Sequence, residues 1–397
     1  MTFTALDHQH MAHALRLAER GLFTTQPNPR VGCVIAHGAE VVGAGWHQRA
    51  GGPHAEVCAL RAAGERARGA TAYVTLEPCA HHGRTPPCAD ALAAAGVARV
   101  VVAAEDPFPQ VDGRGIEKLR AAGIAVETGL LREAARELNV GFFSRHERGR
   151  PWVRLKLAMS LDGRTALGNG ESKWITGAAA RADVQRWRAR SSAILTGSGT
   201  VLADDPRLTV RLDEDASLPP PGRESVADPA RGQGEGTAHA TDWTEVPAAA
   251  FVPPLRVVLD RRLRTPAGSH VLDGSAPTLV LHGDGAACAD DRFARAECRP
   301  VAERDGKLAL PAVLAHLAAR ECNEVHVEAG PALCGALLAE GLADELLLYV
   351  APALLGDDAR PLLHLPALRS MDERWNLRLL DLRPLGADLR LRLRPEA

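Results

Sequence analysis

The segment His54-Ala55-Glu56, followed by Pro78-Cys79 and then Cys88, determines how we interpret the first part of this sequence. His54, Cys79 and Cys88 are residue types that bind zinc, and three protein ligands leave the fourth position of a tetrahedral site open for water. Glu56 follows His54 by two residues and is placed to move a proton of that water. A His-x-Glu segment followed by Pro-Cys and a second cysteine is a signature of zinc deaminases. The pattern predicts a hydrolase that releases ammonia.

The spacing of the two cysteines departs from that signature. Residues 80–87 separate Cys79 from Cys88, where the general pattern has two residues. Because a zinc ion fixes the geometry of its ligands and not the length of chain between them, a loop that leaves and returns is compatible with the site, and we expect it to touch substrate. Two alternatives stay open: a structural zinc closed by His81 or His82 as a fourth ligand, and Glu56 as an ordinary surface carboxylate.

Composition narrows the class of protein. The chain has 397 residues, enough for two or three domains, with 46% hydrophobic and 24% charged residues. A formal net charge of -2 argues against nucleic acid as a partner and favours a small-molecule substrate. Residues 1–20 lack the apolar core of a signal peptide, and we find no apolar run long enough to span a membrane. We expect a cytoplasmic protein.

Helix and strand signals alternate in the first part of the chain, which indicates an α/β sandwich. The expected helices are residues 7–20, 55–66 and 88–95, and the expected strands are residues 31–35, 41–44, 70–75 and 99–103. This order places His54 and Glu56 at the start of one helix and Cys88 at the start of another. The partial positive charge of two helix N-termini would then surround the metal.

A charged stretch with Gly and Pro, residues 144–151, predicts a linker. We therefore expect a deaminase domain at residues 1–148 and a second domain at residues 149–397. Residues 212–254 are rich in Pro, Gly, Ala and acidic side chains and predict a mobile surface insertion. In the second domain we expect a helix at residues 178–190 and strands at residues 153–158, 193–196, 256–259, 278–282, 324–327 and 345–350.

Several motifs together resemble a known family. Residues 28–35 (NPRVGCVI), His54-Ala55-Glu56 and residues 75–88 (TLEPCAHHGRTPPC) are similar to the deaminase domain of the bifunctional deaminase and reductase family of riboflavin biosynthesis. The long loop between the cysteines is a feature of that family. The resemblance implies a cytidine-deaminase-like α/β sandwich followed by a dihydrofolate-reductase-like α/β domain. It also implies that a phosphoribosylated diaminopyrimidinone is deaminated to the uracil and that NADPH then reduces the ribosyl side chain to ribityl.

The resemblance extends to residues of the deaminase site. Asn28 matches the asparagine that contacts the pyrimidine ring in that family. His47, His82 and Arg84 become candidates for binding the ribose and phosphate of the substrate, with ordinary loop structure as the alternative for each. Asp106 resembles a further substrate contact.

The second domain resembles the family's reductase. Residues 155–164 (LKLAMSLDGR), 172–176 (SKWIT), 196–201 (TGSGTV) and 327–333 (VEAGPAL) carry this likeness. The last of these also has a physical reading, because a strand that ends before Gly330 and a helix that begins near Pro331 direct free backbone N–H groups toward a phosphate. A Gly-x-Gly-x-x-Gly after a strand is missing from the sequence, which counts against a Rossmann domain.

The resemblance assigns reductase contacts residue by residue. The positions that match NADPH contacts are Ala158, Trp174, Thr200, Asp204, Gly330, Pro331, Ala332, Leu333, Cys334, Gly335 and Ala336. The positions that match substrate contacts are Ser172, Arg188, Leu208, Arg211 and Glu328, and the two arginines suit a ribose phosphate. Arg261 stands where the family has a small polar residue beside the cofactor, so we assign no contact there. Lys156 and Asp204 are the candidates for polarising or protonating the opening ribose.

We therefore interpret the chain as a multifunctional enzyme of riboflavin biosynthesis, a zinc-dependent hydrolase and an NADP-dependent oxidoreductase. The expected partner is the small-molecule substrate, with no nucleic acid and no membrane, and a homo-oligomer is expected. Two other classes compete with this interpretation: a deaminase of nucleic acids or nucleosides, and a non-catalytic binding module with a structural zinc.

Overall fold

The computed structural model describes residues 3–80, 87–211, 251–286 and 291–396. The described chain forms two compact units: the first runs to Arg148 and also includes residues 251 and 252, and the second consists of residues 149–211 and the described residues from 253 onward. Most of the predicted insertion, residues 212–250, lies outside the described residues. The predicted linker is wrong for residues 144–148, which belong to helix α6 (Val140–Arg148). The buried residues Phe142 and Phe143 anchor this helix in the core. Its last turn is charged, which is why the sequence pattern indicated a linker there and not the end of a helix.

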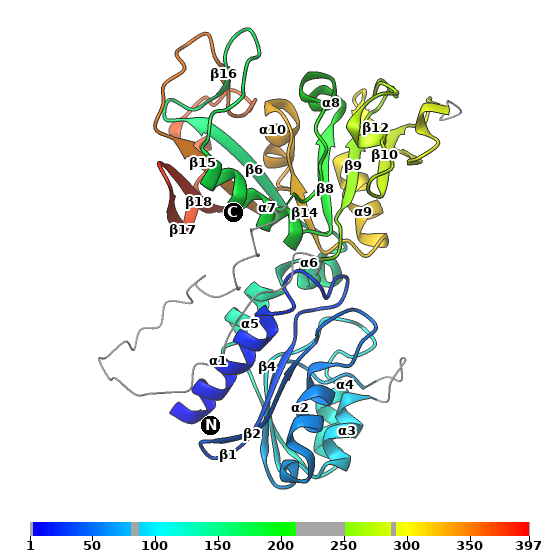
Figure 1. Cartoon of the computed structure of the whole chain (residues 1–397), viewed down its shortest axis with the longest axis vertical. Helices are drawn as coiled ribbons and strands as arrows, with labels where there is room; N and C mark the ends of the chain where they lie inside the picture. Colours follow the sequence, from blue (N-terminus) through cyan, green and yellow to red (C-terminus); the bar gives the residue numbers. More distant parts are fainter. Residues whose placement is uncertain (1–2, 81–86, 212–250, 287–290, 397) are drawn as a thin grey trace. The chain divides into compact units, whose positions relative to one another are not determined.

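The first unit is a three-layer sandwich around a five-stranded sheet of order β2-β1-β3-β4-β5 (Figure 1). Strand β1 is antiparallel to β2 and β3, and β3, β4 and β5 are parallel. The strands are β1 (Gly32–His37), β2 (Glu40–Trp46), β3 (Thr71–Leu76), β4 (Arg99–Ala104) and β5 (Ala125–Thr128). The helices are α1 (Ala5–Glu19), α2 (Ala55–Ala63), η1 (Gly64–Ala67), α3 (Cys88–Ala94), α4 (Arg114–Ala121), α5 (Arg132–Leu138) and α6.

Apolar side chains fill both faces of this sheet. Helix α1 packs on one face, where Met11 contributes to a core that also contains Phe142 and Phe143. Helices α2, α3 and α4 cover the other face through small residues such as Ala59 and through Leu92 and Leu119. Gly43 of β2 allows α2 to approach, because a Cβ atom there would lie 2.3 Å from the carbonyl oxygen of Ala59. Gly45 of the same strand extends this close packing to the start of α2, because a Cβ atom there would lie 2.9 Å from the carbonyl oxygen of Ala55, between His54 and Glu56.

The second unit contains a nine-stranded sheet of order β11-β10-β9-β8-β14-β6-β15-β18-β17. The seven strands from β11 to β15 are parallel, and β18 and β17 add an antiparallel edge. The strands are β6 (Trp152–Ser160), β8 (Ala193–Gly197), β9 (Leu255–Leu259), β10 (Thr278–Gly283), β11 (Glu297–Val301), β14 (Glu324–Val327), β15 (Glu345–Ala351), β17 (Leu377–Leu385) and β18 (Asp388–Pro395). The helices are α7 (Ala178–Arg190), α8 (Ser198–Asp204), α9 (Leu310–Ala319) and α10 (Pro331–Ala339). Short elements complete it: β7 (Arg164–Ala166), β12 (Glu303–Arg304), β13 (Lys307–Leu308), β16 (Arg360–Pro361), η2 (His270–Leu272), η3 (Asp291–Phe293) and η4 (Met371–Glu373).

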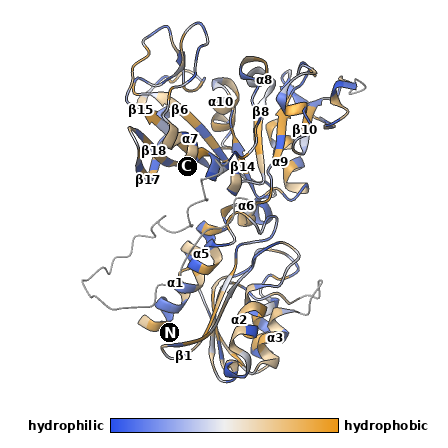
Figure 2. Ribbon diagram, in the orientation of Figure 1, coloured by the Kyte–Doolittle hydropathy of each residue, from blue (hydrophilic) through white to orange (hydrophobic). Residues whose placement is uncertain are grey.

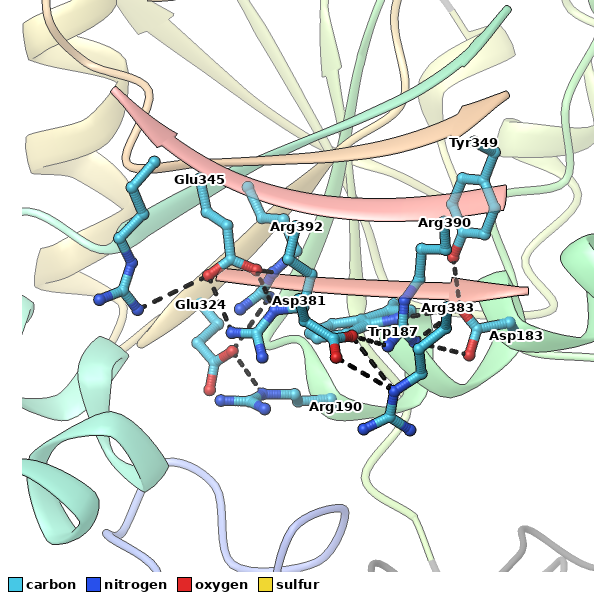
Figure 3. Close-up of polar contacts among 12 residues, drawn as sticks. Asp183, Trp187, Arg190, Glu324, Glu345, Tyr349, Asp381, Arg383, Arg390 and Arg392 are labelled. Atoms are coloured by element: carbon cyan, nitrogen blue, oxygen red, sulfur yellow. Dashed lines mark hydrogen bonds and ion pairs between the residues drawn. The ribbon is translucent and has the colours of Figure 1, made fainter. Parts of the chain in front are cut away.

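The two faces of this second sheet differ in chemistry where α7 packs; over β8, β9 and β10 the α7 face is also apolar, through Ile194, Val258 and Val280. One face forms an apolar core with α9 and α10, and strands such as β8 and β10 are mainly hydrophobic in Figure 2. The other face, beneath α7, carries a buried ionic layer around Trp187 (Figure 3). Arg154 lies there between Glu345, at 2.9 Å, and Glu324, at 3.1 Å, and all three side chains are fully buried. The layer also contains the pairs Arg190 with Glu324, Arg392 with Glu345, and Arg390 with Asp183 and Asp381.

The predicted α/β class and each strand and helix predicted in the described residues are present, with ends shifted by a few residues. Helices α4, α5, α6, α8 and α9 and strands β5, β7, β11, β12, β13, β16, β17 and β18 were not predicted. Within the described ranges, no helix has both the length and the apolar character needed to cross a membrane.

Candidate functional site

The three predicted metal ligands come together in the first unit. His54 precedes α2 as its N-cap residue, Cys79 follows β3, and Cys88 is the first residue of α3. The Nδ1 atom of His54 lies 3.6 Å from Sγ of Cys79 and 3.3 Å from Sγ of Cys88. All three ligand atoms lie within 4.8 Å of one another, and no other such cluster occurs among the described residues. The two helix starts therefore meet at this cluster, as the sequence predicted.

These separations fit a zinc ion. With zinc bonds of about 2.0–2.1 Å to nitrogen and about 2.3 Å to sulfur, a tetrahedral site places neighbouring ligand atoms about 3.5 Å apart. Hydrogen bonds, first from Cys88 and then from His54, lower the pKa of the Cys79 thiol. The same hydrogen bond between the two cysteines raises the pKa of the Cys88 thiol. A coordinated metal ionises both thiols. The cluster thus has the donor set and the spacing of a zinc site with three protein ligands.

Glu56 lies in the first turn of α2, with a side chain that is almost completely buried. Burial raises the pKa of Glu56 to about 7, and the nearby charge of His54 opposes this shift. A carboxyl group that titrates near neutrality can both accept and return a proton. The burial of Glu56 rules out the alternative of an ordinary surface carboxylate.

Asn28 reaches the metal cluster through a histidine. Its side-chain amide lies 3.1 Å from Nε2 of His47, and Nδ1 of His47 lies 3.0 Å from the carbonyl oxygen of Pro53. The rings of His47 and His54 meet edge to face, with centroids 5.4 Å apart. Two of the predicted deaminase residues, Asn28 and His47, are therefore brought next to His54.

The other predicted contacts of the deaminase differ in position. His82 and Arg84, and the alternative fourth ligands His81 and His82, lie outside the described residues. Asp106 follows β4 and is buried; burial first, and then the charges of Glu77 and Cys79, raise its pKa to about 7.

The second predicted site lies at the carboxyl edge of the nine-stranded sheet. Strands β6, β8 and β14 are parallel, so the segments that follow them meet at one edge. Helix α8 begins directly after β8, and Gly330 is the N-cap residue of α10 after β14. A Cβ atom at Gly199 or Gly330 would meet no atom within 4 Å, so the backbone of both turns is open. Two open helix starts at this edge fit the phosphates of a dinucleotide.

Arg188 of α7 and Glu328 pair with each other in this site. Nε and Nη2 of Arg188 donate to the two carboxylate oxygens of Glu328 at 2.6 and 2.7 Å, and Nη1 donates to the carbonyl oxygen of Thr209 at 2.8 Å. Burial would raise the pKa of Glu328, but the charge of Arg188 and its hydrogen bonds hold it well below the usual range. Burial lowers the pKa of Lys156 on β6, and the charges of Glu328 and Arg188 also act on this pKa, in opposite directions.

The remaining predicted reductase residues divide into open and packed positions. Trp174 is 69% exposed, Ser172 and Thr200 are half-buried, and Asp204 and Arg211 are exposed. Leu208 lies in the core with a φ of 49°, and Cys334 and Gly335 are buried within α10. Ala158 lies near the end of β6, and Arg261 pairs with Glu303 at 2.9 Å.

Sequence reasoning missed two residues near these sites. The guanidinium group of Arg181 lies 4.6 Å from the ring centroid of Trp174 and so covers one face of that exposed ring. Glu77, two residues before Cys79, accepts backbone hydrogen bonds from a distant segment. The position of Glu77 beside a metal ligand was the only sequence signal available for either.

Comparison with known proteins agrees with both sites. Residues 4–104 match the family model of the cytidine and deoxycytidylate deaminase zinc-binding region, and residues 151–391 match the RibD C-terminal domain. The chain is 47% identical to the riboflavin biosynthesis protein RibD of Escherichia coli over 98% of this chain and 99% of that protein. It is 44% identical to the RibD of Haemophilus influenzae, over 100% of this chain and 99% of that protein.

Solved structures give the same result for the fold. Acinetobacter baumannii RibD superposes with a TM-score of 0.84 at 43% identity, covering 99% of each chain. A Thermotoga maritima protein described as a diaminohydroxyphosphoribosylaminopyrimidine deaminase and 5-amino-6-(5-phosphoribosylamino)uracil reductase superposes with a TM-score of 0.80 at 30% identity. The match covers 98% of this chain and 99% of that one.

The fold, the cluster of His54, Cys79 and Cys88 and these matches define a zinc-dependent deaminase joined to a reductase on one chain. The predicted fold class and enzyme class are confirmed. The chain belongs to the RibD family of riboflavin biosynthesis.

Proposed function

We propose that this chain catalyses two successive steps of riboflavin biosynthesis, each in one unit. The first step deaminates 2,5-diamino-6-(5-phosphoribosylamino)pyrimidin-4-one to the corresponding uracil, and the second uses NADPH to reduce the ribosyl side chain to ribityl. The observation that carries the proposal is the geometry of His54, Cys79 and Cys88 beside the buried carboxyl group of Glu56. Full-length membership of the RibD family supports the second step.

In the deaminase unit, His54, Cys79 and Cys88 hold zinc. When bound, zinc lowers the pKa of water toward neutrality and so supplies a nucleophile for the ring carbon that carries the amino group. Glu56 accepts a proton from that water and delivers it to the departing ammonia. Asn28, held by His47, orients the pyrimidine ring. Asp106, His82 and Arg84 complete the substrate contacts.

In the reductase unit, the residues chiefly bind and orient. NADPH supplies the hydride for the sugar carbon that is reduced. The open turns at Gly330 and at the start of α8 bind its phosphates, and Trp174 packs against the cofactor. The remaining cofactor contacts are Ala158, Thr200, Asp204, Pro331, Ala332, Leu333, Cys334, Gly335 and Ala336.

Ser172, Leu208, Arg211, Arg188 and Glu328 form the substrate side of the reductase site. Arg188 holds Glu328 in a fixed orientation through one hydrogen bond to each carboxylate oxygen. The ionised carboxylate keeps further lone pairs that can accept a hydrogen bond from a sugar hydroxyl. Arg188 keeps N–H groups beyond those that bind Glu328 and Thr209, and these can bind the ribose phosphate. Lys156 delivers a proton to the opening ribose, with Asp204 as the second candidate.

The division between the two activities falls at residues 1–148 and 149–397. This division is supported by the two compact units of the described chain. We also place the enzyme in the cytoplasm, with no nucleic acid or membrane as a partner. The net charge of -2 supports the exclusion of nucleic acid.

We propose a second copy of this chain as the partner of the open face of β17 and β18. The apolar face of the large sheet continues onto these strands, where Leu379 pairs with Leu393 and Leu382 with Leu391. Leu379 and Leu382 are 51% and 49% exposed on an edge strand, which natural proteins usually cover. Sedimentation should show a dimer or larger assembly that Leu382→Glu dissociates. A monomeric wild-type chain would contradict this.

The two activities can be tested in one assay. The phosphoribosylaminopyrimidine is supplied with NADPH, and ammonia and nicotinamide absorbance are followed separately. Ammonia should appear first, and NADPH should be consumed only after deaminated product has formed. NADPH consumption without ammonia, or ammonia without later NADPH consumption, would contradict the proposal.

A further inference from the structure

Glu77 gathers four backbone N–H groups from a segment far along the chain. Its Oε2 atom accepts from the N–H groups of Asp106 at 3.2 Å and Gly113 at 3.1 Å. Its Oε1 atom accepts from those of Gly115 at 2.9 Å and Ile116 at 3.3 Å. The side chain is 4% exposed, so these bonds replace its hydration. A buried carboxylate is stable only when it is satisfied in this way.

Three of these N–H groups belong to the start of helix α4. The N-cap residue of α4 is Gly113, which has a φ of 83° and no side chain that could cap the helix. The first N–H groups of a helix need partners from outside the helix, and a carboxylate is favoured there by the helix dipole. Glu77 supplies that cap from another part of the unit. Helix α4 therefore depends on a residue two positions before Cys79.

Gly115 makes a second contact between α4 and the segment that precedes Cys79. A Cβ atom at Gly115 would lie 1.9 Å from the carbonyl oxygen of Pro78, so α4 rests directly on the backbone between Glu77 and Cys79. On its other side, the carbonyl oxygen of Cys79 accepts from the N–H group of Ala89 at 3.2 Å. The turn that carries Cys79 is thus clamped between the starts of α3 and α4.

We propose that Glu77 is a positioning residue of the deaminase: it fixes the Cys79 thiolate for zinc and, through the same carboxylate, the backbone of Asp106. This inference rests on the proposed zinc-dependent deamination. Glu77 itself is neither a metal ligand nor a substrate contact. Its effect on the metal passes through Pro78 to Cys79, and its effect on substrate passes through Asp106.

The test is Glu77→Gln in the full-length enzyme. The amide keeps the size of the side chain but replaces one acceptor oxygen by an NH2 group, which cannot accept the two N–H groups it would face. We expect zinc affinity, measured by competition with a chelator, to fall about 10-fold to 100-fold. Ammonia release should fall with it and recover in part when zinc is added, which a purely structural defect would not allow. Glu117→Gln, on the exposed side of the first turn of α4, is the matched control and should change neither quantity.

Gly115→Ala provides an independent variant. It keeps Glu77 but forces α4 away from Pro78, so zinc affinity and ammonia release should change in the same direction. Folded Glu77→Gln enzyme with wild-type zinc affinity and ammonia release would overturn the proposal. Failure of both variants to fold would also overturn it, because Glu77 would then support the fold and not the site. If the wild-type enzyme binds zinc but releases no ammonia, the proposed function fails instead.

Discussion

Arg188 and Glu328 form a bidentate pair, with donor to acceptor distances of 2.6 and 2.7 Å, at the carboxyl end of β14. The side chains of Arg188 and Glu328 are 9% and 15% exposed, and Arg188 also donates to the carbonyl oxygen of Thr209. One guanidinium group therefore holds the Glu328 carboxylate of the proposed reductase site and the loop that contains Leu208. A planar fork is needed for this geometry, and a lysine cannot reproduce it.

Arg188→Lys should impair the reductase selectively. A single ammonium group cannot satisfy both carboxylate oxygens and Thr209, so Glu328 loses its fixed orientation. We expect kcat/KM for reduction of pre-deaminated substrate to fall about 10-fold or more, equivalent to the loss of one or two hydrogen bonds to a charged group. NADPH affinity and ammonia release should stay at wild-type levels. Arg186→Lys on the same helix is the control, and equal losses in both variants would contradict this role.

Removal of zinc should separate catalysis from folding. The two hydrophobic cores of the first unit consist of packed apolar side chains, and none of the three metal ligands belongs to either core. A chelator should therefore abolish ammonia release while circular dichroism and the reduction of pre-deaminated substrate are retained. Unfolding of the first unit on chelation would instead support the alternative of a structural zinc.

The buried ionic layer should contribute to stability only as a complete set. Glu345→Gln leaves Arg154 and Arg392 without a full counter-charge in a position closed to water. Breaking a buried ion pair in this way typically costs about 3–5 kcal/mol of the free energy of unfolding. Urea unfolding of the reductase unit should report that loss. Glu297→Gln, which removes an exposed pair with Arg320, should cost less than about 1 kcal/mol.

His146 should make the first unit sensitive to mild acid. Burial, with a smaller effect of Arg145, lowers its pKa to about 4, and its ring lies between Phe108 and Phe142. The unfolded chain binds a proton at a pKa of about 6.5, so the unfolded state binds more protons between about pH 6.5 and 4. The stability that neutral His146 contributes is complete above this range and is lost as the pH falls through it. When the pH is lowered from about 7.5 to about 5, the urea concentration at the unfolding midpoint should decrease in the wild type, and it should decrease less in His146→Phe. Equal decreases in the two proteins would contradict this.

The zinc site could be predicted because its information is local. His54 and Glu56 lie at the start of one helix, and Cys88 begins another. A pattern of a few residues is therefore enough to predict where these side chains lie. The role of Glu77 could not be predicted in this way, because its four donors lie 29 to 39 residues further along the chain. The short and polar helix α4 carries too weak a signal to reveal that it lacks its own cap.

Strand β18 shows a second limit of the sequence. Its alternating leucines and arginines suggest buried leucines and exposed arginines, but Leu389 is 39% exposed and Arg390 is 1% exposed. The period of two identifies the two faces without identifying the inner one. Asp183 and Glu345, which come from α7 and β15, decide that the charged face is buried.

We propose that Glu56 moves the proton in a deaminase site built on the three zinc ligands His54, Cys79 and Cys88. The most direct test is the rate of ammonia release by Glu56→Gln enzyme whose zinc content has been measured. We predict one zinc per chain, a decrease in ammonia release of about 100-fold to 10,000-fold, and unchanged reduction of pre-deaminated substrate. Ammonia release at the wild-type rate from this variant would contradict the account.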